Sequence, residues 1–236
     1  MHKPSEATIA LLPSPLLGRA AWEPVQERLL ALGRPVVVAD VPRRPRVPDD
    51  VLAAFVSVLA REDEVVLVPH SNAGLYAPAL TETVACRATV FVDAALPSST
   101  PSTPLAPPQL MEHLRELADE AGRLPPWTRW WRAADVDHLF PDATWRRRIE
   151  AREPRLALSY FTSRVRVPEG WATRPAAYLA FGGTYAHETA VARGHGWPLD
   201  VLEGRHLHML HEPDAVAGRI LGLLEQLETR RAYSGP

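Results

Sequence analysis

The chain has 236 residues, of which 46% are apolar and 23% charged, and its formal net charge at pH 7 is -2. This length fits one α/β domain with an insertion better than two domains, and the apolar content suffices for an ordinary core. The near-neutral charge gives no electrostatic reason to expect nucleic acid or an anionic membrane as a partner. A single cysteine excludes an intramolecular disulfide framework. No window approaches the roughly twenty apolar residues of a membrane span, so we expect a soluble, cytoplasmic protein.

Short apolar runs alternate with helical patterns along the chain, which is typical of a parallel sheet covered by helices. Each run is continuous and does not alternate with polar residues, so we expect both faces of the sheet to be buried. Six such runs predict six strands: Thr8–Leu12, 35–39, 65–68, 88–92, 176–181 and 199–202.

Apolar residues spaced three and four apart predict helices between these strands. A first helix over residues 22–32 is expected to stop at Gly33, and a second over residues 49–59 to be capped by its leading aspartates. The last helix is expected to begin near Pro213. Proline has no backbone N–H, and at the first helical position that N–H would have no partner within the helix.

The long stretch between the fourth and fifth runs, residues 97–173, is expected to be a helical cap inserted into a core of residues 1–96 and 174–236. It opens with a Pro/Ser/Thr-rich segment that indicates an extended linker, and helical patterns follow at residues 109–121 and 142–160. So long an excursion is hard to place inside the sheet. Above the carboxyl ends of the strands it would cover the place where open α/β sheets bind ligands.

Ser71 carries the clearest chemical signal. It lies in the segment His-Ser-Asn-Ala-Gly, directly after a buried valine-rich run and before a helical pattern, which is the context of a nucleophile elbow. Such a turn exposes the hydroxyl above the sheet, and the next helix points its free N–H groups at developing negative charge. The glycines usual on either side are replaced here by Pro69 and Ala73. The alternative interpretation is that Ser71 only caps the following helix.

From Ala10 to Val216, the order of elements, the elbow and the segments 92–97 and 204–208 resemble a compact member of the α/β-hydrolase superfamily. The resemblance implies an α/β-hydrolase fold: a mostly parallel six-stranded sheet flanked by helices, with the helical cap inserted after the fourth strand. The first two strands of larger members are absent. The resemblance specifies the fold more than the substrate, because the superfamily hosts many reactions.

The resemblance places the catalytic histidine at His206, in the loop between the last strand and the last helix. A residue there can reach a hydroxyl on the elbow and remove its proton as a general base. His208 and His211 are the rival positions. The three histidines could also suggest a metal site, but no cysteine or spaced carboxylate pattern accompanies them, so we expect neither a metal nor a cofactor.

The acid that would orient this histidine has two candidates. Many superfamily members carry an aspartate after the strand before the last, but the loop over residues 182–188 contains none. Asp93, at the carboxyl end of the fourth strand, is preferred because a strand terminus is a fixed position, and Glu188 is the second candidate. Without a catalytic role, Asp93 would be a turn-forming residue.

Two backbone N–H groups are expected to form an oxyanion hole. The resemblance points to Asn72, directly after the nucleophile, and to the loop after the first strand, where we choose Leu16. In that loop Ser14 and Pro15 replace the usual His-Gly pair.

Aromatic residues gather in and near the cap. They are candidates for a substrate-binding surface, and the alternative is that they attach the cap to the sheet. The candidates are Trp127, Trp130, Trp131, Tyr160 and Tyr185.

The sequence therefore predicts a serine-nucleophile hydrolase, esterase-like or thioesterase-like, acting on a small acyl substrate through an acyl-enzyme. One alternative is a cyclase, lyase or acyl transferase that uses the same cleft. The other is a non-enzymatic ligand-binding module. The only partner we expect is a small-molecule acyl compound, with no nucleic acid and no membrane.

Overall fold

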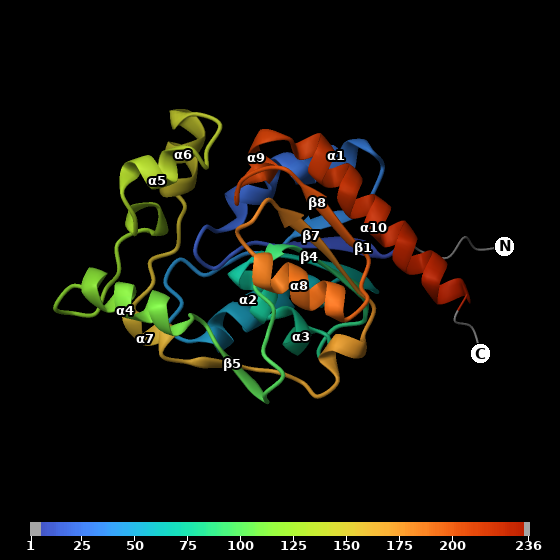
Figure 1. Cartoon of the computed structure of the whole chain (residues 1–236), viewed down its shortest axis with the longest axis horizontal. Coiled ribbons are helices and arrows are strands. Elements are labelled where there is room, and N and C mark those ends of the chain that lie inside the picture. The colour runs from blue at the N-terminus through green and yellow to red at the C-terminus, as the bar shows by residue number, and fades with distance from the viewer. Residues whose placement is uncertain (1–5, 234–236) are drawn as a thin grey trace.

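Six strands form one sheet in the order β2-β1-β3-β4-β7-β8, and every neighbouring pair in it is parallel (Figure 1). The computed structural model describes residues 6–233. The strands of this sheet are β1 (Thr8–Leu12), β2 (Val36–Val38), β3 (Val65–Ser71), β4 (Cys86–Ala94), β7 (Ala176–Phe181) and β8 (Leu199–Leu202).

Three inner strands are buried along their whole length, as their continuous apolar runs predict. Every residue of β1, β3 and β7 is buried, whereas the edge strand β8 is only partly covered. Burial on both faces requires helices on both sides of the sheet. The predicted fold class, a parallel six-stranded α/β sheet, is confirmed.

Helices cover the two faces of the sheet in two groups (Figure 1). One face carries α1 (Glu23–Ala31), α9 (His208–His211) and α10 (Pro213–Tyr233), and the other carries α2 (Pro48–Leu59), α3 (Ala77–Leu80) and α8 (Ala186–Gly194). Of the helices in residues 6–233, none combines the length and apolar character that crossing a bilayer takes.

The predicted helix ends are largely confirmed, with one difference. Gly33 follows α1 with a φ of 75°, and Pro213 is the first residue of α10. At the start of α2, Asp50 does not precede the helix but lies in its first turn, where its carboxylate accepts the N–H groups of Arg46 and Val47 at 2.7 and 3.2 Å. The carboxylate therefore satisfies backbone groups from inside the helix.

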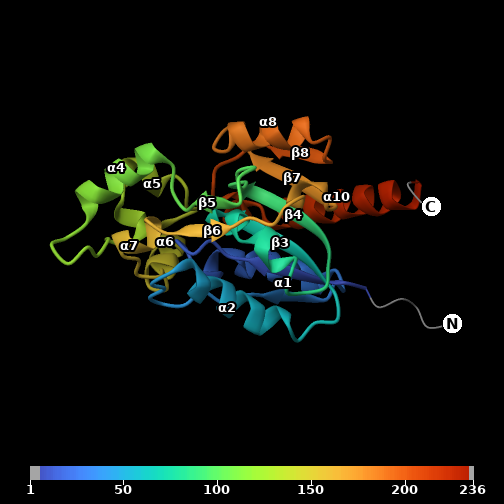
Figure 2. The same ribbon diagram turned by 90° about the horizontal axis from the view of Figure 1, so that it is seen from below.

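The insertion contains more structure than its composition predicts. Residues 102–104, within the expected linker, form a strand that pairs antiparallel with a second short strand, so the two ends of the insertion lie side by side (Figure 2). Its elements are β5 (Ser102–Pro104), α4 (Pro108–Leu117), η3 (Trp127–Arg129), α5 (Ala133–Asp137), α6 (Ala143–Glu150), α7 (Leu158–Phe161), β6 (Arg164–Arg166) and η4 (Trp171–Thr173).

The single helix predicted over residues 142–160 is wrong. The helix α6 ends at Glu150, and α7 begins only at Leu158. Pro154 lies between them, and proline both removes a helical hydrogen bond and disfavours helical geometry at the residue before it.

Gly74 allows the elbow to pack against the next strand. A Cβ at this position would overlap the carbonyl oxygen of Ala95 and lie 3.1 Å from the Cβ of Ala94. The backbone after Ser71 can therefore approach the end of β4 only because residue 74 has no side chain.

Replacing this glycine should destabilise the protein. We expect Gly74→Ala to lower the free energy of unfolding by about 2–4 kcal/mol, because the overlapping atoms belong to the backbone and cannot move aside cheaply. Gly218→Ala is the matched control: Gly218 is exposed within α10 with open space around it, and alanine there should add about 0.5–1 kcal/mol. Urea unfolding of both variants measures the difference, and equal stability would contradict the packing argument.

Candidate active site

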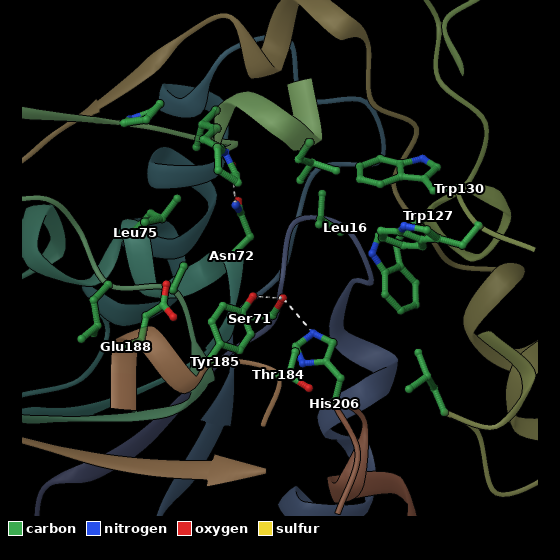
Figure 3. A pocket seen from close by; sticks show the side chains of 18 of the residues that line it. Leu16, Ser71, Asn72, Leu75, Trp127, Trp130, Thr184, Tyr185, Glu188 and His206 are labelled. Carbon is green, nitrogen blue, oxygen red and sulfur yellow. Dashed lines mark hydrogen bonds between the residues drawn. The ribbon is translucent and has the colours of Figure 1, made fainter. Parts of the chain in front are cut away.

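Ser71 ends β3 in a strained backbone conformation, with φ 57° and ψ -131°. Such a conformation in a residue other than glycine costs of order 1–3 kcal/mol, and proteins retain it mainly at functional sites. The side chain makes no capping hydrogen bond to the short helix η2 (Asn72–Leu75) that follows. Instead its hydroxyl faces a cavity (Figure 3). The geometry is that of an elbow, not of a helix cap.

Three side chains that are far apart in sequence form one hydrogen-bonded chain. His206 Nε2 lies 3.1 Å from Ser71 Oγ (Figure 3), and His206 Nδ1 lies 2.7 Å from Asp93 Oδ2. All three residues are buried. Because the aspartate accepts the Nδ1 proton, the neutral imidazole presents a lone pair at Nε2, which accepts the serine proton.

Asp93 is held firmly at the end of β4. Its φ is 40°, its side chain is fully buried, and its second oxygen accepts the backbone N–H of Phe181 at 3.0 Å. Of the two acids considered, the structure brings Asp93 to the histidine. Glu188 lies in the first turn of α8 and lines the cavity instead.

His70 is a site residue that the sequence analysis missed. Its Nε2–H donates to the backbone carbonyl of His206 at 3.0 Å, and the two rings stack with centroids 4.6 Å apart. Its ring is fully buried beside Trp22, and desolvation lowers the pKa of His70 well below 6.5. The available signal was its position on a buried strand immediately before the elbow serine. Its ring fixes the height and tilt of the His206 loop.

The rival histidines point elsewhere. His208 packs against Phe181. The Nε2 atom of His211 lies 2.9 Å from the backbone carbonyl oxygen of Leu139. Desolvation lowers the pKa of His208. Among residues 6–233, no three His, Cys, Asp or Glu side chains are grouped so that they could hold a metal ion.

The two residues expected to supply oxyanion donors both line the cavity beside Ser71 (Figure 3). Asn72 is the first residue of η2, where helical N–H groups have no partner within the helix. The N–H of Leu16 donates to the buried Ser14 hydroxyl at 3.3 Å, which is a long bond. An oxygen in the cavity would therefore compete with Ser14 for this donor.

The cavity has a volume of about 620 Å³ and lies between the cap and the carboxyl ends of β3, β4 and β7. Four of the five predicted aromatic residues line it: Trp127, Trp130, Trp131 and Tyr185. Leucines from the cap and the core add to the apolar surface: Leu16, Leu75, Leu96, Leu105, Leu110 and Leu139.

The prediction that Tyr160 binds substrate is wrong. Tyr160 is fully buried and outside the cavity lining, and its hydroxyl hydrogen-bonds the hydroxyl of Tyr76. Because Tyr160 lies in α7 and Tyr76 in the core, this pair attaches the cap to the sheet domain. Desolvation raises the pKa of both phenols, so both stay protonated and share one hydrogen bond.

Tyr185 brings a further polar group close to Ser71. Its hydroxyl lies 3.4 Å from Ser71 Oγ, on a different side from His206 (Figure 3). Burial raises the pKa of Tyr185, so the phenol keeps its proton around neutral pH. Since the serine proton points to His206, Tyr185 is the donor in this weak contact.

No protein-family model and no curated protein sequence matches the chain. Solved structures do match. An extracellular alpha/beta-hydrolase from a Paenibacillus species, described as a structural and functional homologue of tobacco Salicylic Acid Binding Protein 2, superposes with a TM-score of 0.71 at 16% identity. The match covers 92% of this chain and 99% of that one. The chain has the α/β-hydrolase fold.

Other α/β-hydrolase-fold structures agree. Tomato Methylketone Synthase I with 2-tridecanone matches with a TM-score of 0.69 at 14% identity, covering 94% of this chain and 99% of that one. A pyrethroid hydrolase from Sphingobium faniae JZ-2 matches with a TM-score of 0.63 at 19% identity, covering 93% and 97%. At these identities the likeness shows the fold, and the resemblance predicted from the sequence is confirmed at that level.

Burial of His70 should make stability depend on pH. Below pH 6.5 the unfolded chain protonates this histidine but the folded protein does not, so the free energy of unfolding falls as pH falls. The loss is up to about 1.4 kcal/mol per pH unit for one proton. His70→Gln, which keeps a donor for the His206 carbonyl but does not titrate, should remove that part of the slope. Urea unfolding across this pH range measures it.

His187→Gln, which changes an exposed histidine, serves as the matched control. If wild type and His70→Gln lose stability equally on acidification, His70 is not buried in its neutral form.

Proposed function

We propose that the protein is a serine hydrolase that cleaves small ester or thioester substrates through an acyl-enzyme. The observation that carries this proposal is the hydrogen-bonded chain Asp93–His206–Ser71, with the serine hydroxyl 3.1 Å from the imidazole and open to an apolar cavity. Nucleophile, base and orienting acid within hydrogen-bond distance of one another form the arrangement that acyl transfer requires.

The first half-reaction acylates the serine. Ser71 Oγ attacks the carbonyl carbon of the substrate while its proton passes to His206 Nε2, 3.1 Å away. The tetrahedral intermediate collapses when the carbon–oxygen or carbon–sulfur bond to the leaving group breaks. His206 returns the proton to the departing alcohol or thiol, and the acyl group stays on Ser71.

The second half-reaction releases the acid. Water attacks the acyl carbon and gives its proton to His206, and the bond from carbon to Ser71 Oγ then breaks as the serine recovers that proton. The sum is substrate plus water giving a carboxylic acid and an alcohol or thiol. Asp93 stabilises the imidazolium in both halves, because its buried carboxylate lies 2.7 Å from Nδ1.

The developing oxyanion needs two donors. The N–H groups of Asn72 and Leu16 are assigned this role, since both residues border the cavity beside the nucleophile. The Leu16 N–H exchanges its long bond to Ser14 for the oxyanion. A donor that transfers from a neutral hydroxyl to a full negative charge gains strength, and losing one such donor typically costs about 2.7–4 kcal/mol.

The cavity supports a small-molecule substrate. Its volume of about 620 Å³ is ordinary for a ligand site, and most of its lining is apolar or aromatic. Two structures of the same fold suit the proposal, because one is named a pyrethroid hydrolase and the other polyneuridine aldehyde esterase.

Covalent labelling tests the nucleophile. A fluorophosphonate probe should add to Ser71 in the native protein, giving one adduct by intact mass, and Ser71→Ala should give none. Ser57→Ala, which changes an exposed serine on α2, is the matched control and should label fully. Equal labelling of wild type and Ser71→Ala would end the proposal. Labelling at Ser71 with no hydrolysis of any ester or thioester would favour acyl transfer to another acceptor.

Changing the acid tests the tautomer argument. Asp93→Asn keeps an oxygen for the Phe181 N–H but turns an amide toward His206 Nδ1, which favours the wrong tautomer. We expect kcat for a nitrophenyl ester to fall about 10⁴-fold with the fold intact. Glu188→Gln should not cause such a loss. A comparable fall in kcat in Glu188→Gln, with little effect of Asp93→Asn, would make Glu188 the orienting acid.

A further inference from the structure

The charges around the cavity are one-sided. Two carboxylates line it, those of Asp135 and Glu188, and no Lys or Arg is among its described lining residues. Asp135 is already neutralised, because Arg132 pairs with it through two hydrogen bonds at 2.8 and 3.1 Å. Glu188 differs: every ion pair in the described part of the chain involves other carboxylates. The cavity therefore contains one negative charge without a counter-ion.

The start of α8 places this carboxylate on the same side of the cavity as Tyr185. Tyr185 immediately precedes α8 and Glu188 lies in its first turn, so a spacing of three residues puts both on the same side of the helix. Figure 3 shows Glu188 beside Tyr185, with the Tyr185 hydroxyl between the carboxylate and Ser71. The charge thus borders the space next to the reacting atoms.

The opposite side of the cavity is aromatic. In the view of Figure 3, Trp127 and Trp130 lie across Ser71 from Glu188. The ring centroids of Trp127 and Trp131 are 5.5 Å apart and those of Trp130 and Trp131 are 5.7 Å apart, so the three indoles form one cluster. Indole faces attract cations, and tryptophan does so more strongly than the other aromatic residues.

We infer that the cavity selects cationic acyl compounds, namely esters or thioesters that carry a quaternary or protonated amine. This rests on the proposed hydrolase function. A cation beside Glu188 gains Coulomb attraction in a partly desolvated space, and the indole cluster adds to it or packs the apolar part of the substrate. A carboxylate or phosphate substrate is repelled, because no lining Lys or Arg offsets Glu188.

Two pairs of isosteric substrates test this selection. The first is acetylthiocholine and the thioacetate in which a tert-butyl group replaces its trimethylammonium group, which places the cation in the leaving group. The second is the nitrophenyl ester of trimethylammonio-butanoic acid and its tert-butyl isostere, which places it in the acyl group. The two members of each pair differ in charge and hardly in shape. The measured quantity is the ratio of kcat/KM, cationic over neutral.

In at least one pair we expect this ratio to be about tenfold or more. Glu188→Gln should bring it close to one by slowing the cationic ester. Glu169→Gln, which removes the same charge from an exposed position outside the cavity, is the matched control and should keep the wild-type ratio. A ratio of one or less in both pairs, with the neutral esters still hydrolysed through Ser71, would overturn the inference and leave the hydrolase proposal standing.

Binding separates the two proposals if no ester is hydrolysed. Phenyltrimethylammonium, titrated against tryptophan fluorescence in Ser71→Ala, should bind at least about tenfold more tightly than benzenesulfonate, and Glu188→Gln should remove most of that difference. If Ser71→Ala binds with this preference while the wild-type protein hydrolyses no ester, the hydrolase proposal is rejected and the cation site is kept. Absence of the preference would reject the cation site.

Discussion

The pairing of β3 with β4 at their carboxyl ends sets the geometry on which the rest of the site depends. Ser71 stands opposite Ala94, and its carbonyl accepts the N–H of Ala95 at 3.1 Å. Ser71 and Asp93 therefore lie at neighbouring positions at the ends of adjacent strands, each with a positive φ. The ring of His206 lies between them and hydrogen-bonds both. Close contact at Gly74 keeps the two chain segments at this separation. The strain at both strand ends is offset by the surrounding sheet, whose central strands are buried on both faces.

The rest of the site around Ser71 and Asp93 comes from loops at the carboxyl ends of the strands. His206 is supported by His70, which belongs to the same strand as Ser71, so one strand carries both Ser71 and the residue that supports His206. The cap contributes the indoles and little of the chemistry. Tyr160 attaches it to the core, and Glu188 contributes a carboxylate to the cavity that the indoles also line. The strand β3 thus positions both Ser71 and His206, whereas the cap and α8 line the space around them.

Several features could be predicted from local patterns because the interactions behind them are local. Continuous apolar runs predicted six strands, three of them with their observed bounds, and Gly33 and Pro213 marked helix ends. Other features could not. The strand at residues 102–104 has no apolar run and exists because residues 164–166 lie beside it. The predicted helix over residues 142–160 ignored Pro154. His70 was overlooked because its partner, a backbone carbonyl, lies 136 residues away.

The sequence by itself determined the fold class, the strand order along the chain and the elbow at Ser71, because each follows from apolar periodicity and turn chemistry within a few residues. It also narrowed the carboxylate partner of His206 to two residues. Only the tertiary structure decided between them, since the choice depends on which carboxylate reaches Nδ1 of His206 across 113 positions of chain. The tertiary structure was also needed for Tyr160, because the sequence pattern was compatible both with a place in the cavity and with a contact between cap and sheet. Distances between remote segments arise from packing of the whole molecule, and no local pattern encodes them.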